Sequence, residues 1–152
     1  MLEYHKMTEE EKYCIARWKY PGEYAIYNSL SYEEQKKRGF GFANPENHLY
    51  SFYDGKELVG FINLNGEDQG VFFGIGANPD CCGKGYGQQM TRMAWEISQT
   101  LFPGKPMYLE VRTWNQRAIR CYEKAGFRIV GEPIQQTTSI GEGAFYHMVR
   151  RG

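Results

Sequence analysis

A run of alternating glycines near the middle of the chain constrains the fold more than any other feature. Gly83, Gly85 and Gly87 follow an apolar segment, residues 71–77, and precede apolar residues that recur at helical spacing. A strand that leads through glycines into a helix exposes backbone N–H groups, and the helix dipole adds positive charge there. Three glycines within five residues lose much backbone entropy on folding, which favours a bound ligand over a plain turn. The run therefore predicts a loop that binds an anion, such as the pyrophosphate of a cofactor.

The glycine spacing of this loop does not match either of two familiar phosphate-binding motifs. The P-loop requires GxxxxGK followed by Ser or Thr, but Gly85 follows Lys84, and Asn78 stands five residues before Gly83. The dinucleotide-binding fingerprint requires GxGxxG at the first strand of the fold, whereas this chain has GxGxG in mid-sequence. The loop therefore indicates another class of cofactor site, to which Lys84 would add a charge-assisted contact.

The segments around the loop predict a mixed α/β fold. We expect helices at 7–18, after Ser31, from the glycine loop to Pro103 and after Asn115, and strands at 48–53, 58–64, 71–77, 107–112, 127–131 and 144–149. Residues 71–112 form a βαβ unit, so its two strands should be parallel, whereas the other strands should be antiparallel. The fold class expected is therefore α/β, as a three-layer α/β/α sandwich around a mixed, largely antiparallel sheet.

Local signals support these boundaries. Thr8 and Glu11 have the spacing of a capping box, and Asp54-Gly55 is a strong hairpin turn. Gly126 stands where a helix C-terminal glycine belongs. The glycines of Gly74-Ile75-Gly76 interrupt an apolar strand, which predicts either a bulge or the close approach of another group to the backbone.

Length and charge narrow the class of protein. The 152 residues suit one domain spanning 1–152, and 41% hydrophobic residues are typical of a folded chain. The chain has 18 Lys plus Arg and 18 Asp plus Glu, so its formal net charge is zero. This charge balance gives no indication of binding to nucleic acid or to an anionic membrane. The chain has no signal-peptide pattern and no long apolar run, so we expect neither secretion nor a membrane span.

The four cysteines favour a reducing compartment, the cytoplasm. Cys14, Cys81, Cys82 and Cys121 show no CxxC spacing, and adjacent Cys81 and Cys82 suit free thiols better than an ordinary disulfide. The three histidines show no paired-ligand pattern, so no metal is expected.

Two blocks of sequence resemble the GCN5-related N-acetyltransferase superfamily. The cofactor motif Q/R-x-x-G-x-G/A is matched by residues 82–87, although Cys82 stands at its first position. The second block, N-x-x-A-x-x-x-Y-x-x-x-G-F, is met in full by Asn115, Ala118, Tyr122, Gly126 and Phe127. The resemblance covers residues 70–132 well, and residues 110–127 also resemble ribosomal-protein alanine acetyltransferases.

The resemblance implies acetyl-CoA as co-substrate and no metal. The strands at 71–77 and 107–112 should splay apart, so that the pantetheine arm pairs with backbone near Ile75 and Ala77. The pyrophosphate should lie on the amides of residues 83–87, and the replacement at Cys82 matters little because that contact is made through the backbone. The residues expected at the cofactor are Ile75, Gly76, Ala77, Cys82, Gly83, Lys84, Gly85, Tyr86, Gly87, Asn115, Ala118 and Tyr122.

Acetyl transfer requires a neutral amine, donors for the oxyanion and a proton for the departing thiolate. The Gly74-Ile75-Gly76 backbone is the expected oxyanion donor, and the resemblance makes Tyr122 the proton donor. Glu110 is the first candidate base, with Glu67 and Asp68 as alternatives acting through water, and a purely structural role for Glu110 stays open. Arg112, Arg117 and Arg120 are candidates for the 3′-phosphate of CoA.

The acceptor is expected to be a small amine or a peptide N-terminus. Aromatic residues crowd the first third of the chain, and in the superfamily that region walls the acceptor site: Trp18, Tyr20, Tyr24, Tyr27, Tyr32, Phe40 and Phe42. Ordinary packing would explain them equally well. The alternative function is a non-catalytic CoA-binding regulatory module of the same fold, and the sequence leaves open whether the chain is a monomer or a homodimer.

Overall fold

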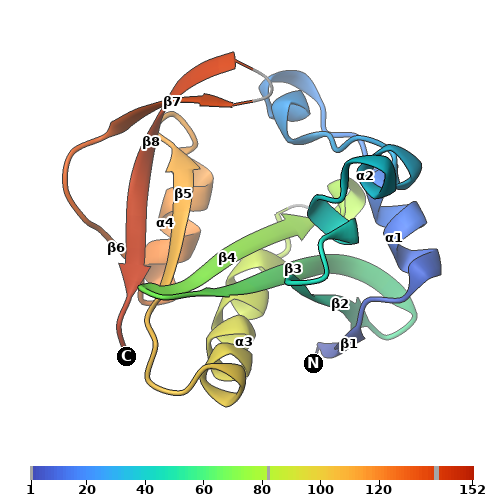
Figure 1. Cartoon of the computed structure of the whole chain (residues 1–152), viewed down its shortest axis with the longest axis horizontal. Coiled ribbons are helices and arrows are strands. Elements are labelled where there is room, and N and C mark those ends of the chain that lie inside the picture. Colours follow the sequence, from blue (N-terminus) through green and yellow to red (C-terminus); the bar gives the residue numbers. More distant parts are fainter. Residues whose placement is uncertain (1, 82, 139–140) are drawn as a thin grey trace.

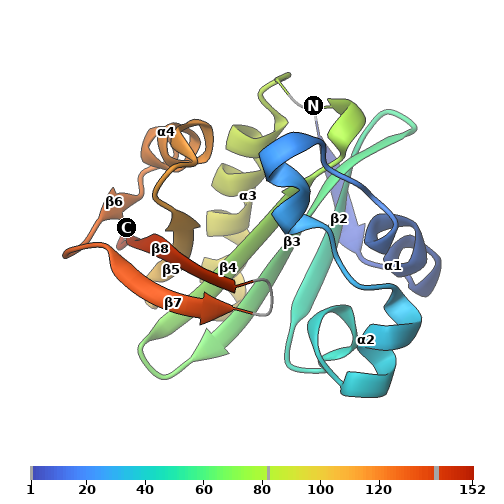
Figure 2. The same cartoon turned by 90° about the horizontal axis from the view of Figure 1, so that it is seen from above.

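The strands of the chain form one mixed sheet between two layers of helices (Figures 1 and 2). The computed structural model describes residues 2–81, 83–138 and 141–152. In chain order the elements are β1 (Glu3–Lys6), α1 (Glu9–Ala16), η1 (Gly22–Tyr27), α2 (Tyr32–Arg38), η2 (Gly41–Ala43), β2 (His48–Asp54), β3 (Glu57–Glu67), β4 (Gly70–Ala77), η3 (Pro79–Cys81), α3 (Tyr86–Leu101), β5 (Met107–Arg112), α4 (Gln116–Lys124), β6 (Arg128–Ile129), β7 (Ile134–Thr138) and β8 (Gly141–Arg150). No helix within the described ranges is long and apolar enough to cross a bilayer.

The strand order is β1-β2-β3-β4-β5-β8-β6, with β7 also paired to β8. Within the described part of the sheet, only β4 and β5 run parallel. Strand alternation sends side chains to two cores. Ile62 and Leu64 of β3 join the large core under α3 and α4, while Phe61 packs with Ile15 of α1 on the other face. The three-layer α/β/α prediction is therefore confirmed.

The sheet opens between its two parallel strands. β4 and β5 pair only at Val71↔Met107 and Phe72↔Tyr108, and then diverge into the V that Figure 1 shows. The Val71 N–H donates to the Pro106 carbonyl at 2.8 Å, so it faces β5. Because backbone groups alternate along a strand, those of Ile75 and Ala77 face the same side, where β5 has already moved away. The splay expected of this strand pair is confirmed.

The bulge expected at Gly74-Ile75-Gly76 is absent. The register between β3 and β4 runs without a shift from Gly60↔Ala77 to Glu67↔Gly70. Close approach explains Gly76 instead, since a Cβ added there would lie 2.3 Å from the Phe61 ring. A strand glycine thus makes room for a neighbouring aromatic ring without any change of register.

Most local signals are confirmed, and the weakly patterned segments were missed. Thr8 and Glu11 form both hydrogen bonds of the capping box, and Gly126 adopts a φ of 98° just after α4. β1 has no apolar alternation and all its residues are exposed, so periodicity could not find it. The C-terminal strand expected at 127–131 is only two residues long, as β6, and the polar strand β7 was not predicted at all.

A buried carboxylate ties α1 to the first two strands. The side chain of Glu11 accepts hydrogen bonds from the Thr8 amide at 2.9 Å, from the Ser51 hydroxyl at 2.8 Å and from Tyr53, and His5 Nε2 lies 2.9 Å from Oε2. Burial alone would raise the pKa of Glu11, but the hydrogen bonds from Tyr53, Thr8 and Ser51 outweigh it and lower the pKa to about 2. The negative charge of Glu11 therefore stabilises the folded state.

The stability of the fold should depend on this charge in acid. The Glu11 pKa lies below its usual value of 4.5, so the stabilisation is complete above about pH 4.5 and is lost as the pH falls towards about 2. The difference corresponds to about 3 kcal/mol of unfolding free energy. We expect Glu11→Gln to remove most of this at neutral pH and to flatten the acid dependence, as measured by urea unfolding from about pH 7 to 3. The exposed neighbour Glu10 is the control; equal losses for Glu10→Gln and Glu11→Gln would contradict this role.

Candidate active site

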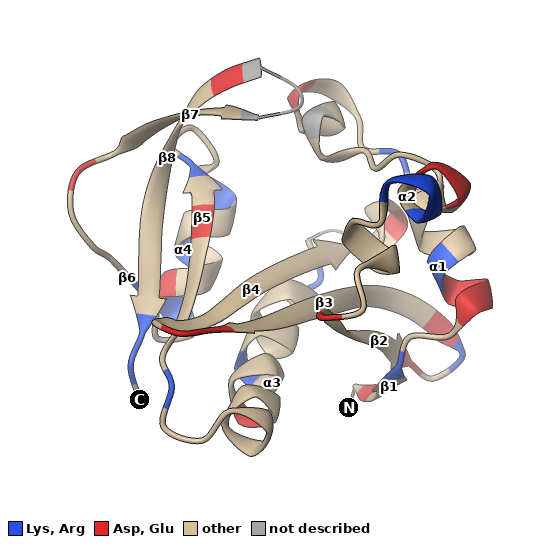
Figure 3. Cartoon of the chain, in the orientation of Figure 1, with Lys and Arg blue, Asp and Glu red and all other residues tan. Residues whose placement is uncertain are grey.

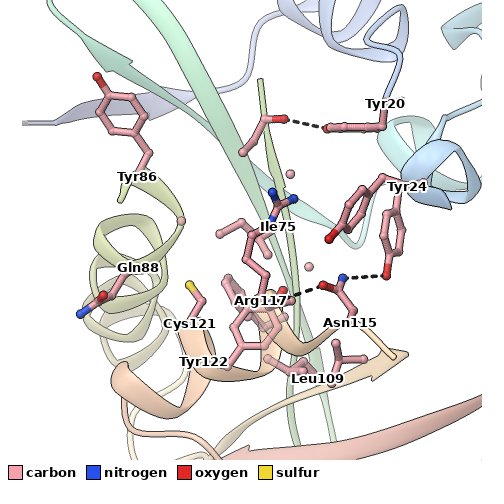
Figure 4. Close-up of a pocket in the computed structure, with 18 of the residues that line it drawn as sticks. Tyr20, Tyr24, Ile75, Tyr86, Gln88, Leu109, Asn115, Arg117, Cys121 and Tyr122 are labelled. Atoms are coloured by element: carbon pink, nitrogen blue, oxygen red, sulfur yellow. Dashed lines mark hydrogen bonds between the residues drawn. The ribbon is translucent and has the colours of Figure 1, made fainter. Parts of the chain in front are cut away.

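A cleft of about 590 Å³ lies where β4 and β5 diverge (Figure 4). Its floor and walls come from both strands, the start of α3, the length of α4 and the N-terminal segment. Elements distant in sequence therefore meet at one hollow. The parallel pairing ends at Phe72 and Tyr108, whereas β5 continues to pair with β8 on its other edge as far as Arg112, so the gap between β4 and β5 stays open.

The glycine loop enters the cleft as the start of α3. Gly83 and Gly85 have φ values of 84° and 80°, a left-handed conformation that favours glycine. Gly85 is the N-cap of α3 and offers no capping side chain, so the first amides of a 16-residue helix lack a side-chain acceptor. Gly87 and Tyr86 line the cleft as well. This end of the cleft is suited to a bound anion.

The other loop residues expected at the cofactor are Cys82, Lys84 and Tyr86. Cys82, expected at the cofactor, lies outside the described residues. Lys84 is exposed and is not part of the cleft wall in the described structure. The hydroxyl of Tyr86 donates to Asp54 at 2.6 Å, so its side chain ties the loop to the β2–β3 hairpin.

The open edge of β4 presents backbone groups to the cleft. Ile75 directs its N–H and C=O into the gap, whereas Gly76 directs its own towards β3. The carbonyl of Ala77 accepts a hydrogen bond from the Tyr20 hydroxyl at 2.8 Å. Gly74 also directs its amide towards β3, so within this glycine segment it is Ile75 whose N–H enters the gap.

Asn115 closes the opposite wall. Its Oδ1 accepts from the Ala118 amide at 3.3 Å, which makes it the N-cap of α4 as expected. Its Nδ2 donates to the Tyr27 hydroxyl at 3.0 Å (Figure 4). Asn115 is buried, so the cap and the contact to the N-terminal segment share one fixed side chain.

Tyr122 lies one turn after Ala118 on α4 and faces the cleft (Figure 4). Its ring packs edge-on against Phe73 and Phe127, with centroids 6.4 and 6.1 Å away. Burial raises the pKa of the Tyr122 phenol, so it keeps its proton at neutral pH. None of the described residues accepts a hydrogen bond from this hydroxyl. A protonated phenol that faces a cleft without a protein partner is a suitable proton donor.

Glu110 lies on one face of β5, and the buried Leu109 and Val111 lie on the opposite face, as the alternation in sequence predicted. It is exposed, lines the cleft and accepts a hydrogen bond from Gln136 Nε2 of β7 at 2.6 Å. The alternatives lie elsewhere. Glu67 accepts a hydrogen bond from the Tyr108 hydroxyl, and Asp68 is exposed in the turn after β3.

An aromatic roof consists of Tyr20, Tyr24 and Tyr27, which line the cleft, and of Trp114, which packs on two of these tyrosines without lining the cleft. The Tyr24 ring lies 5.6 Å from Trp114 and 6.5 Å from Tyr27, and the Arg117 guanidinium lies 4.6 Å above Tyr24. The roof links η1 to α4. Of the aromatics expected at the acceptor site, the cleft is lined by Trp18, Tyr20, Tyr24 and Tyr27, whereas Tyr32 and Phe42 belong to the second core and Phe40 is exposed.

The charges of the cleft are unevenly placed. Three basic residues of α4 line its wall: Arg117, Arg120 and Lys124. Figure 3 shows the positions of Lys and Arg along the chain, including those on α4. Arg112 is buried on the Glu110 face of β5, with its guanidinium 4.6 Å from the Phe145 ring. Of the arginines expected near a phosphate, Arg117 and Arg120 therefore line the cleft from α4, and Arg112 lines it from β5.

The sequence matches one family model over most of its length. The acetyltransferase (GNAT) family model covers residues 10–127. The chain belongs to this family. The match includes both blocks that line the cleft, the glycine loop and the segment from Asn115 to Phe127.

The proteins to which this GNAT chain is similar include one curated relative and several solved structures of the same fold. The N-alpha-acetyltransferase RimI of Mycobacterium tuberculosis is 32% identical over 94 residues, which is 59% of this chain and 57% of that protein. The alignment thus spans little more than half of the curated relative. Among solved structures, spermidine N-acetyltransferase from Vibrio cholerae in complex with CoA and spermine has a TM-score of 0.75 at 20% identity, over 97% of this chain and 94% of that one. The ribosomal-protein-S18-alanine N-acetyltransferase from Escherichia coli has a TM-score of 0.72 at 17% identity, over 99% and 93%.

Two residues beside the cleft of this GNAT chain have no signal in the sequence. Trp114 precedes the N-cap Asn115 in a loop, and no periodicity in the sequence predicts that it packs on the distant Tyr24. Gln136 lies on a strand that was not predicted, so its contact to Glu110 had no signal. Both depend on tertiary contacts between segments more than 20 residues apart.

Proposed function

We propose that the chain is an acetyl-CoA-dependent N-acetyltransferase that moves an acetyl group to a primary amine by direct attack. One observation carries the proposal: the gap between β4 and β5 opens onto the uncapped, glycine-rich start of α3 at one end and onto Tyr122 within it. In the gap, backbone groups of β4 that pair with no other strand can bind a ligand arm that contains amides. The backbone N–H groups at the start of α3 can bind a diphosphate. The proposed reaction takes place in the cytoplasm, where thiols such as Cys81 and Cys121 stay reduced.

The residues present fit CoA on their own chemistry. The amides of residues 83–87 would hold the diphosphate, and Arg117, Arg120 and Lys124 would add positive charge beside it. The C=O of Ile75 would pair with the pantetheine arm, which leaves the Ile75 N–H for the reacting thioester, and the carbonyl of Ala77 would accept from the arm once Tyr20 withdraws. Asn115 and Ala118 form the opposite wall.

Each catalytic task has one candidate group. Acetyl-CoA supplies the thioester that is attacked. Glu110 removes the proton of the incoming ammonium, directly or through water, because an alkyl amine has a pKa of about 10 and must lose that proton to react. The Ile75 N–H donates to the oxygen on which negative charge develops. Tyr122 delivers a proton to the departing thiolate.

The acceptor proposed is a small amine or a peptide N-terminus. Both classes appear in the names of the relatives, as spermidine and as an alanine of a ribosomal protein. The aromatic roof and Trp18 form an apolar passage that suits the carbon chain of an amine, with Glu110 at its polar end. We propose that the chain acts as a monomer or a homodimer.

A thiol-release assay tests the proposal. The chain is incubated with acetyl-CoA and a panel of alkyl amines, polyamines and N-terminal peptides, and free CoA thiol is followed with time. We expect release that depends on one class of acceptor. Tight CoA binding without thiol release from any acceptor would instead identify a non-catalytic CoA-binding module.

Tyr20→Phe should strengthen cofactor binding. The substitution keeps the ring of the roof but frees the Ala77 carbonyl, so CoA no longer competes with the Tyr20 hydroxyl. A net hydrogen bond is worth about 1 kcal/mol, so we expect the Kd for acetyl-CoA to fall roughly threefold to tenfold, as measured by calorimetry. Tyr32→Phe is the control, because its hydroxyl donates over the same 2.8 Å to Glu9, away from the cleft. Weaker binding by Tyr20→Phe would contradict the assignment of Ala77 to the cofactor.

A further inference from the structure

The carboxylate of Glu110 accepts a hydrogen bond from a residue of β7. Gln136 Nε2 donates to Glu110 Oε2 at 2.6 Å, and β7 reaches this position only because it pairs with β8, which in turn pairs with β5. In the β7–β8 register Gln136 lies opposite Gly143, and the Arg112 guanidinium occupies the space that a side chain at Gly143 would fill. Gln136 is half-buried, whereas Gln135 and Thr137 on either side are exposed.

The other neighbours of Glu110 leave its orientation unsettled. His147 is its register partner on β8, but the His147 ring stacks on Tyr108 at 5.3 Å. Tyr108 in turn donates its hydroxyl to Glu67. Arg112, two residues on, packs over Phe145 and directs Nη1 to the Glu142 carbonyl at 3.5 Å.

Gln136 is therefore the described side chain that fixes Glu110. A hydrogen bond to a carboxylate is among the stronger polar contacts, and it also selects one rotamer of an exposed, flexible side chain. The second oxygen, Oε1, accepts no hydrogen bond from any residue in the described ranges, so it remains available for an amine or a water in the cleft.

We propose that Gln136 is a positioning residue that holds Oε2 of Glu110, so that Oε1 is presented to the acceptor amine. The inference rests on the proposed N-acetyltransferase function with Glu110 as base. It assigns a role in proton removal to a polar residue of β7, a strand that contributes no other hydrogen bond to the described cleft.

The test is a double-mutant cycle with Glu110→Gln and Gln136→Ala. We expect Gln136→Ala to lower kcat roughly tenfold or more with the KM for acetyl-CoA unchanged, because the base is misplaced while the cofactor site stays intact. Gln136→Glu keeps the size of the side chain and removes the donor, so it should lose at least as much. In the Glu110→Gln background, Gln136→Ala should have no further effect. Gln135→Ala, on the outward face of β7, should behave as wild type.

Three results would separate the possible failures. Equal kcat for wild type and Gln136→Ala, with a slow Glu110→Gln, would overturn the positioning role and leave the function standing. Additive losses in the double variant would also overturn it, because Gln136 would then act independently of Glu110. Absence of turnover by the wild type with every acceptor would reject the proposed function itself.

Discussion

Tyr122→Phe is expected to lower kcat by roughly a hundredfold or more while changing the Kd for acetyl-CoA less than twofold. The hydroxyl has no acceptor among the described residues, so its removal leaves no protein group unpaired. The ring keeps its edge contacts with Phe73 and Phe127, so packing is preserved. The loss is therefore that of a general acid, whose contribution is typically a hundredfold to ten-thousandfold. Steady-state kinetics and calorimetry on the same preparation measure both quantities.

Tyr146→Phe is the matched control for this change. Tyr146 of β8 packs against the same core but does not line the described cleft, so its hydroxyl should be dispensable for turnover. Unchanged kcat in Tyr122→Phe would remove Tyr122 from the mechanism. A fall in cofactor affinity equal to the fall in kcat/KM would assign the hydroxyl to binding rather than to proton transfer.

Gly85→Ala is expected to weaken acetyl-CoA binding at least tenfold. Gly85 has a φ of 80°, which costs a residue with a Cβ about 1–2 kcal/mol, so the loop should relax away from the conformation that aims its amides at the cleft. The amides at the start of α3 lose their common direction, and several charge-assisted hydrogen bonds to the diphosphate weaken together. Calorimetric titration with acetyl-CoA measures the change.

Gly104→Ala controls for strain alone. Gly104 has the same φ of 80°, and a Cβ added to either glycine meets no atom within 4 Å. Both variants should therefore lose a similar amount of unfolding free energy, about 1–2 kcal/mol, but only Gly85→Ala should lose cofactor affinity. Equal affinities for the two variants would show that the loop conformation does not matter for binding.

The parts of the fold that sequence predicted well are those specified by local chemistry. The capping box of Thr8 and Glu11, the turn at Gly55 and the glycine after α4 need only a few neighbouring residues, and each is confirmed. The order of strand, glycine loop, helix and strand also predicted the parallel pair, because a helical crossover requires it. The divergence of that pair was expected only from the family resemblance.

The parts that were missed depend on distant contacts. At Gly76 the sequence predicts a bulge or a close approach, and the structure shows the close approach; the group that approaches is Phe61 of the neighbouring strand, which the sequence does not place there. β7 contains the polar residues Gln135 and Gln136 and is stabilised by pairing with β8 rather than by burial. The roof over the cleft likewise joins Tyr24 to Trp114, ninety positions apart in the chain. Such contacts have no local pattern that a single sequence can show.

The central claim is that the splayed strands and the glycine loop form a site for coenzyme A. Isothermal titration of the folded wild-type chain with CoA tests it most directly, because binding is read without any assumption about the acceptor. We expect saturable heat for about one CoA per chain, with a Kd near the micromolar range. No heat with folded protein at about millimolar CoA, a concentration at which even a weak site would fill, would contradict it.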